Sequence, residues 1–517
     1  MSESQLHFPP LPAGERLLAT VAVSLAIFMY GLDLAVTNVS IPAIAGDLGS
    51  SISQGTWAIT AYAVGNAIVI PLTGWLTARV GQVRLFIASV LLFTLASALC
   101  GLSQSLEMLV FFRCIQGIVS GPMNPLAMAL LMQAYPPQKA AMAMGATMMT
   151  GMLSPALGPI MGGWITDNFS WPWIFYVNIP VGIFSAWVSW RLFQHRETPK
   201  VKQPVDYVGL GLLVTWVGAL QIMLDLGREH AWFESSLVIA LAVLALTGFA
   251  FFVVWEWYEP HPMVDLKLFT RPHFSIAVAL IGIANIPYFG NVVLTPLWLQ
   301  NTLGYTATLS GSVVMVGGIA MFMIQPLVAR WVPQLGFRQL AAIGLCFMVL
   351  SAYMRAGFTP GVSHGDLLLP QLLYGIGTSA MFMPLVLLAV HGLPQWQLAG
   401  ATGLNSCVRT LTTGFGTSIA TTLWDQRTIH HHAQLTSHIT LYDSVPMQAT
   451  SGLGNTVGGE AALNIVERLI NTQAQTLAVN DFNIFSIAMF LVCLGFLWLV
   501  KPGKAEPAGT AVHALDH

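Results

Sequence analysis

The sequence predicts an all-α protein that crosses a membrane many times, and its composition is the first reason. Of the 517 residues, 55% are hydrophobic and 8% are charged, whereas a typical soluble protein carries roughly 25% charged residues. This small number of charges cannot cover the surface of a water-soluble protein of this size. A soluble enzyme and a disordered scaffold are therefore both excluded. A net charge of -2 provides no basic field for binding nucleic acid.

The second observation is a series of apolar runs, each long enough to cross the hydrocarbon core. A spanning helix needs about 20 mostly apolar residues. The first run follows Glu15 and Arg16 without a small-residue cleavage site, so we expect a retained span rather than a signal peptide. We predict fourteen spans: 16–37, 57–76, 83–102, 107–131, 141–166, 173–193, 208–224, 236–258, 274–298, 309–330, 337–357, 367–391, 400–424 and 482–500.

The third observation is the distribution of Lys and Arg, which sets the orientation. With the N-terminus in the cytoplasm, fourteen of the 20 basic residues fall in inside segments and four in outside loops. Two more, Arg113 and Arg409, lie within spans. This bias predicts that both termini are cytoplasmic.

Two similar loops indicate an internal repeat, a common feature of transporters. Segments 72–85 and 326–340 each give an apolar helix end, then Ala-Arg, a Gly and a second Arg. Each lies between the second and third helix of a six-helix set if spans 7 and 8 are an insert. We therefore expect a 6+2+6 organisation: an N-terminal bundle in 1–200, a two-helix insert in 201–272, and a C-terminal bundle in 273–517 with an external loop at 425–481.

Span 1 carries Asp33, the only carboxylate well inside a predicted span. A charge at a helix centre costs about 2.5–3.5 kcal/mol on insertion scales, so such residues usually face a cavity and carry function. Burial favours the neutral form of a carboxyl group, which makes Asp33 a candidate proton carrier. The alternative is a structural partner in a buried ion pair.

Span 4 carries Arg113 and Gln116, which are three residues apart and share a helical face. Counted from the outer ends of their spans, the depths of Arg113 and Asp33 agree within about 3–5 Å. We therefore hypothesise that Arg113 faces Asp33 across the N-terminal bundle, and that a proton on Asp33 would weaken the pair.

Span 5 is rich in Gly and Pro, which bend a helix and let a neighbour approach closely. Gly145 is followed by Pro155-Ala-Leu-Gly-Pro-Ile-Met-Gly-Gly163. Taken alone, this pattern also fits an ordinary small-residue packing face.

Together these motifs resemble the major facilitator superfamily, and within it the fourteen-span drug:proton antiporters of the EmrB/QacA type. The resemblance extends from the first span to the last. Span 5 resembles the antiporter motif G-x8-G-x3-GP-x2-GG, with Ser154 at the middle Gly. The resemblance implies a major facilitator fold and a conformational role for Gly145, Pro155, Gly158, Pro159, Gly162 and Gly163.

The loop after span 2 resembles the superfamily's gating loop, G-x-x-x-D-R-x-G-R-K. Ala78 stands at the position of the acid, and this puts a charge relay through that position in doubt. The arginines of the loop could instead cap helix ends or meet lipid phosphates. The matching residues are Gly74, Arg79, Gly81 and Arg84.

Further family-like motifs supply candidate cavity residues. Asn38 lies within the span 1 motif Leu32–Pro42, which resembles the family's LDxTIVNVALP, and either bonds substrate or caps the end of the span. Asn405 and Arg409 lie on one face of span 13, where a structural tether is the alternative. With Arg113 and Gln116 they form the expected substrate cavity. Two cavity arginines and one acid favour neutral, weakly acidic or amphipathic substrates. The Trp171–Gly182 motif, which resembles the family's entry to span 6, is interpreted as positional.

Several other signals are discounted. The five cysteines show no CxxC or Cys/His spacing, so no disulfide framework or zinc site is indicated. A metal site at His430–His432 with Asp425 and His438 is not expected, because no further ligands lie at helical spacing. The chain has no Gly-Lys-Ser/Thr phosphate loop and no Ser/His/Asp set at one depth, so neither ATP-driven transport nor hydrolysis is indicated.

We therefore expect a transporter and not an enzyme: a proton-coupled multidrug exporter of the bacterial inner membrane that works by alternating access, with no cofactor besides the proton gradient. Its link 193–206 and the start of the external loop resemble the EmrB branch. That branch implies a periplasmic EmrA-type adaptor and an outer-membrane TolC-type channel. The alternatives are an exporter of a physiological cargo (fatty acid, siderophore or metabolite) and a non-transporting receptor, which would need neither Asp33 nor the Gly/Pro-rich span 5.

Overall fold

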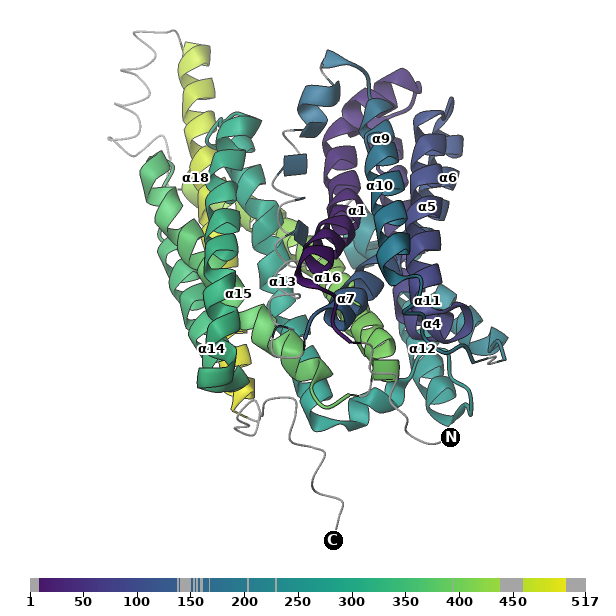
Figure 1. Ribbon diagram of the computed structural model, residues 1–517. Coiled ribbons are helices and arrows are strands. Elements are labelled where there is room, and N and C mark those ends of the chain that lie inside the picture. Colours follow the sequence, from purple (N-terminus) through teal and green to yellow (C-terminus); the bar gives the residue numbers. More distant parts are fainter. Residues whose placement is uncertain are drawn as a thin grey trace.

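The computed structural model shows a bundle of long helices (Figure 1). It describes residues 9–136, 139, 150–151, 154, 157–158, 161–166, 168–201, 204–227, 230–393, 395–437 and 459–498. Every regular element in these residues is helical, which confirms the all-α prediction. The start of α1 and the end of α18 lie at the same end of the bundle, the lower end in Figure 1.

The first half of the chain forms helices that lie to the right in Figure 1. Their bounds are α1 (Ala13–Asp47), α2 (Ile52–Gly55), α3 (Trp57–Val69), η1 (Ile70–Leu72), α4 (Thr73–Val80), α5 (Gln82–Gly101), α6 (Leu106–Ser120), α7 (Met123–Ala134), α9 (Trp173–Tyr176) and α10 (Asn178–Phe193). Predicted spans 2, 4 and 6 are each built from consecutive helical pieces.

The second half begins with α11 (Tyr207–Leu226), η3 (Trp232–Glu234), α12 (Ser236–Tyr258) and η4 (Leu266–Thr270). It continues with α13 (Pro272–Asn301), α14 (Ala307–Arg355), α15 (His364–Val390), α16 (Gln395–Ser437) and α18 (Gly459–Leu497). Helix α11 packs on α12, on α3 of the first half and on α16 of the second. The predicted division into two bundles and an insert stays a prediction.

Eleven helices of the described residues are long and apolar enough to cross a membrane. One of them, α14, contains predicted spans 10 and 11, which meet at Gly336 where the backbone leaves the helical conformation. Helix α16 occupies predicted span 13 but is not among these eleven helices. Most of predicted span 5 lies outside the described residues. The structure is therefore that of a multi-pass membrane protein.

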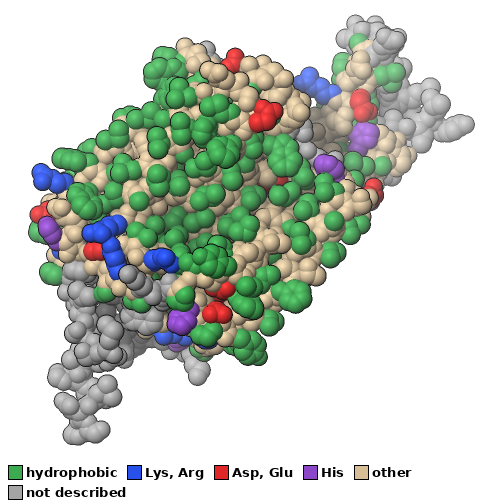
Figure 2. Space-filling model, turned by 90° about the vertical axis from the view of Figure 1, so that its right-hand side faces the viewer, with side chains coloured by type: hydrophobic (Ala, Val, Ile, Leu, Met, Phe, Trp, Pro, Cys, Tyr) green, Lys and Arg blue, Asp and Glu red, His purple; other side chains and the backbone are tan. Residues whose placement is uncertain are grey.

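The surface matches this assignment. Figure 2 shows hydrophobic side chains across most of one face, with charged and His side chains gathered towards its two ends. Helix α12 is the extreme case, since only 22% of its most apolar stretch is buried inside the protein. A broad apolar belt of this kind is stable only against lipid.

Part of the predicted external loop 425–481 is helical, and its external position stays a prediction. Helix α16 continues to Ser437 and α18 begins at Gly459, so much of this segment is helical. The predicted ends of spans 13 and 14 are where the apolar runs end. A helix can continue beyond such a run where its polar side chains find hydrogen-bond partners. Here the two extensions bond each other: Arg427 and His431 of α16 both contact Asp481 of α18, at 3.5 and 2.9 Å.

Two equivalent corners support the internal repeat. Gly81 separates α4 from α5 with φ 99° and ψ 149°, and Gly336 interrupts α14 with φ 80° and ψ 162°. A positive φ at these values is strained for any residue with a side chain. The two glycines of the repeated loops therefore adopt the same backbone conformation at corresponding positions.

The two halves meet mainly through α16, which packs on α4, η1 and α7. The contact includes a close backbone approach, since a Cβ at Gly74 would lie 2.8 Å from the Cα of Gly400. These contacts lie at the end of the bundle where α1 and α5 begin. Gly74 of the predicted gating loop is thus a point of contact between the two halves.

We predict that Gly81→Ala is destabilising. The positive φ alone costs roughly 1–2 kcal/mol, and the new Cβ would lie 2.5 Å from the carboxyl carbon of Glu197. The measurement is the midpoint of thermal unfolding in detergent. Gly14→Ala is the matched control, because that glycine is helical with open space around it and Ala favours a helix by about 0.5–1 kcal/mol. Equal midpoints for the two variants would contradict the prediction.

Candidate functional site

Asp33 lies at the centre of a buried polar network inside the first half. Its exposed fraction is 2%, and its carboxylate accepts three bonds from two other helices. Arg113 Nη1 of α6 donates to Oδ2, while Gln116 Nε2 donates to Oδ1 at 3.0 Å. Asn178 Nδ2 of α10 donates to Oδ1 at 3.2 Å. The pairing of Asp33 with Arg113 that helical depth predicted is present.

Arg113 is completely buried and is held by groups of several kinds. Its Nε donates to the carbonyl of Ala58 at 3.2 Å, and Nη1 also donates to Gln116 Oε1 at 2.8 Å. Its guanidinium carbon lies 4.4 Å from the ring centre of Tyr62 and 5.7 Å from that of Phe175. Aromatic faces stabilise a cation in a desolvated site. Nη2, by contrast, has no hydrogen-bond partner among the described residues.

Asn178 is a site residue that the sequence analysis missed. Its Nδ2 also donates to Ser97 Oγ at 3.0 Å, and Ser97 donates to the carbonyl of Phe175 at 3.0 Å. The residue was within the Trp171–Gly182 motif, which was interpreted only as positional. An Asn in an apolar run needs partners, and this requirement was the available signal.

The Gly/Pro-rich segment packs against the part of α1 that carries Asp33. A Cβ at Gly158 would lie 2.2 Å from the Cβ of Ala35, and one at Gly162 would lie 3.0 Å from Cγ1 of Val36. Ser154 Oγ donates to the carbonyl of Phe28 at 3.2 Å. Small residues therefore allow backbone-level contact here. Gly163 has open space around it, and Gly145, Pro155 and Pro159 lie outside the described residues.

The candidate residues of span 13 lie apart from this network. Asn405 is buried and its Oδ1 has no described partner. Arg409 is partly buried, with its guanidinium carbon 5.8 Å from the ring centre of Phe382. Tyr288 of α13 and Tyr30 of α1, one from each half, lie within electrostatic range of its guanidinium.

Asn38 does not join either group. It is exposed, five residues beyond Asp33 on α1. Tyr30 of the same helix belongs to a separate polar group in the first half, in which its hydroxyl donates to Asn66 Oδ1 at 3.3 Å. Asn66 in turn donates to Ser120 Oγ at 2.8 Å.

The gating-loop residues contact an acid that the sequence analysis did not consider. Glu197, in the link after α10, accepts the backbone N–H groups of Val83 and Arg84 at 3.0 Å each. Its carboxylate also lies 4.0 Å from Arg84 Nε. An acid at a helix N-terminus is favourable, so Glu197 caps α5 from a distant part of the chain. Arg79 lies over the ring of Trp75 at 5.2 Å.

The His-rich part of α16 bonds acids of α18. His431 Nε2 lies 2.9 Å from Asp481 Oδ2, and His432 Nε2 lies 3.0 Å from Glu467 Oε1. Within the described residues no group of three or more His, Cys, Asp or Glu side chains is arranged to hold a metal ion.

The Asp33 network contains a buried ion pair. Its carboxylate accepts three bonds, one of them from the cation Arg113, and a proton on it would remove the counter-charge that Arg113 needs. A group of this kind has two states that differ in charge and in bonding. Buried ionisable residues within a membrane span commonly mark a proton or ion pathway.

Comparisons with known proteins give the context. The profile of the Major Facilitator Superfamily matches residues 23–417. The "Multidrug export protein EmrB" of Haemophilus influenzae is 42% identical over 99% of this chain and all of its own length. That of Escherichia coli is 42% identical over 95% of this chain and 97% of its own. The "Fatty acid resistance protein FarB" of Neisseria gonorrhoeae is 38% identical over 96% and 98%.

Solved structures share the fold at low sequence identity. The human organic anion transporter MFSD10 gives a TM-score of 0.55 at 15% identity, covering 93% of this chain and 100% of its own. A double-tryptophan mutant of XylE gives 0.57 at 12% identity, covering 94% and 99%.

We predict that Arg113→Ala destabilises the protein by about 3–5 kcal/mol, the usual cost of leaving one member of a buried ion pair uncompensated. Asp33→Asn added to Arg113→Ala should recover part of the loss, because the amide carries no charge and still accepts bonds. Unfolding in detergent measures both effects. Arg468→Ala is the control, since this arginine is exposed on α18. A double variant no more stable than Arg113→Ala would argue against the charge as the cause.

Proposed function

The chain belongs to the Major Facilitator Superfamily, and within it we propose that the protein is a proton-coupled exporter of several amphipathic compounds in the bacterial inner membrane. The observation that carries this proposal is 42% identity to EmrB multidrug export proteins across almost the full chain. Identity at this level over the full length supports the same overall design in this chain.

Proton coupling through Asp33 is the mechanistic part of the proposal. The network in which Asp33 lies joins α1, α6 and α10. The same stretch of α1 contacts the Gly/Pro-rich segment through Gly158 and Gly162. Protonation of Asp33 would weaken its bonds to Arg113, so it would change the energy of the contact between these helices. We propose that this change biases alternating access.

The contacts between the two halves support an alternating-access cycle. They concentrate where α16 meets α4, η1 and α7, at the end that Lys and Arg predict to be cytoplasmic. We propose that this conformation is closed to the cytoplasm. We further propose fourteen spans with both termini inside. Support comes from the eleven apolar helices, the division of α14 at Gly336, and helix α16.

Substrate recognition is proposed for the region between the halves. Arg409 is partly buried and lies near Tyr30 and Tyr288, one from each half. A partly exposed cation among aromatic rings suits weakly acidic or amphipathic compounds. Asn405 and Asn38 are proposed to line the same path.

A second candidate function is the export of fatty acids as a physiological cargo. The observation that favours it is 38% identity to the fatty acid resistance protein over 96% of this chain. Both functions place an amphipathic molecule in the same cavity, so only the substrate separates them.

The decisive experiment is cargo accumulation in everted vesicles under an imposed pH gradient, acidic inside, with a drug panel and a long-chain fatty acid as cargo. We predict gradient-driven transport in the wild type and its loss in Asp33→Asn. Glu107→Gln is the matched control, because Glu107 is an exposed acid on α6. Transport that survives in Asp33→Asn would place proton coupling elsewhere, and transport of the fatty acid alone would favour the second candidate.

We also propose that the protein works with a periplasmic EmrA-type adaptor and a TolC-type outer-membrane channel. On the proposed topology, the extensions of α16 and α18 reach into the periplasm. They carry exposed apolar side chains, with Ile465 38% and Leu469 62% exposed one turn apart on α18. Exposed apolar side chains that lie beyond the lipid indicate a protein contact.

We predict that Leu469→Glu abolishes co-purification of the adaptor while leaving the unfolding midpoint unchanged, because the side chain is exposed in the free protein. Co-expression with a tagged adaptor and pull-down from detergent measures binding. Leu246→Ser is the control, since Leu246 is 71% exposed on α12. Retained binding in Leu469→Glu would move the docking surface away from α18.

A further inference from the structure

Two acids, Asp206 and Glu256, lie close together in the α11–α12 region, apart from Asp33. Asp206 precedes α11, and its Oδ1 accepts the backbone N–H groups of Val208 and Gly209 at 3.1 and 2.9 Å. Its Oδ2 accepts the indole N–H of Trp255 at 2.8 Å. Glu256, the next residue on α12, is 1% exposed, and its Oε2 accepts the backbone N–H of Val264 at 3.3 Å.

The two carboxyl groups border the same small space. A Cβ at Gly209 would lie 2.2 Å from Asp206 Oδ2 and 2.6 Å from Glu256 Oε1. Any side chain at position 209 would therefore collide with both acids. Because glycine has no side chain, both oxygens border the space beside position 209.

Glu256 Oε1 is buried and has no hydrogen-bond partner among the described residues. The charged groups that act on Glu256 are Asp206 from the start of α11 and Glu259 from the segment after α12, and both are acids. The segment around Val264 contributes a backbone N–H. No Lys, Arg or His in the described ranges forms an ion pair with either carboxylate of the pair.

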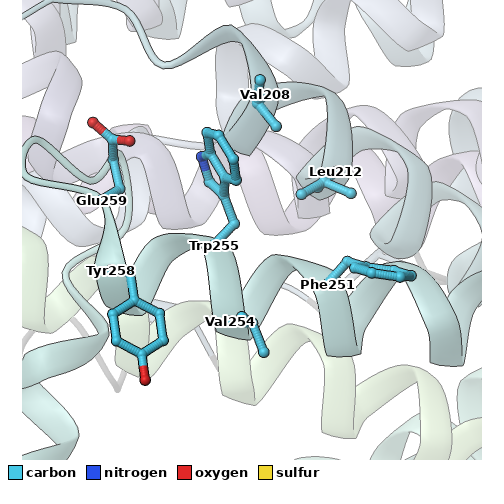
Figure 3. Close-up of a pocket in the computed structure, with 7 residues that line it drawn as sticks. All are labelled: Val208, Leu212, Phe251, Val254, Trp255, Tyr258 and Glu259. Atoms are coloured by element: carbon cyan, nitrogen blue, oxygen red, sulfur yellow. The ribbon is translucent and has the colours of Figure 1, made fainter.

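Glu256 is buried, and Trp255, which bonds Asp206, lines an apolar groove between α11 and α12. Figure 3 shows Trp255 between these helices, with Val208 and Leu212 on one side, Phe251 on the other, and Glu259 at the end of the groove. Two adjacent carboxylates in such surroundings repel each other strongly, and a single shared proton removes that repulsion and supplies the missing bond.

We propose that Glu256 and Asp206 form a proton-binding site, in which Glu256 Oε1–H donates to Asp206 Oδ2. The bound proton joins the start of α11, the end of α12 and the segment 259–265 that leads to α13. On the proposed topology this site faces the cytoplasm. Loss of the proton leaves two carboxylates side by side and loosens this junction.

Infrared spectroscopy of the purified full-length chain in detergent tests the proposal without any transport assay. The carbonyl band of a protonated carboxylic acid is followed while the pH is raised. We predict a band in the wild type at neutral pH that disappears at higher pH and that is absent in Glu256→Gln. Glutamine keeps the shape and can donate to Asp206 and accept from Val264. Glu259→Gln is the matched control and should keep the band.

A wild-type band that persists in Glu256→Gln would overturn the proposal, as would a band that disappears in Glu259→Gln. Asp206→Asn provides a second test, because the amide oxygen still caps α11 while the neighbouring charge is gone. The band should then titrate at lower pH, and an unchanged titration would contradict a shared proton. None of these outcomes bears on export, so the failure of this site and that of the proposed function are distinguishable.

Discussion

The constraint on which the structure depends is that a polar group inside a membrane has no water to bond. Each such group must find its partners within the protein or destabilise it. Asp33 and Arg113 are both buried, and together they require more donors and acceptors than one ion pair supplies. Gln116, Asn178 and the carbonyl of Ala58 supply further partners, although Arg113 Nη2 has none among the described residues. The arrangement of α1, α3, α6 and α10 follows from this shared network.

Close packing on α1 connects the Asp33 network to the Gly/Pro-rich segment. α1 bonds α6 and α10 through Asp33, and a few residues further along it meets the Gly/Pro-rich segment at Gly158 and Gly162. Packed interfaces of this kind adopt discrete arrangements rather than deforming continuously. A change of charge on Asp33 therefore acts on a contact that has no room for small adjustments. This is the physical basis on which a proton could select between two access states.

The sequence predicted the features that depend on local pattern, namely the apolar runs, the Gly corners and the depth that pairs Asp33 with Arg113. It missed features that depend on distant segments meeting. Glu197 caps α5 from more than a hundred residues away, and no spacing rule connects the two. Asn178 was hidden in a motif with a positional interpretation. The composition of 460–477 is itself helix-forming, but the extension of α16 was missed because bonds to α18 maintain it beyond the apolar run.

In the proposed coupling, the same network would set the direction. Arg113 stays charged under all ordinary conditions, so a proton on Asp33 would leave a buried cation without its counter-charge. The rings of Tyr62 and Phe175 would offset part of that cost, but Nη2 already has no described partner. The proposal therefore requires a rearrangement that gives Arg113 water or another acceptor, so that proton binding and helix movement occur together.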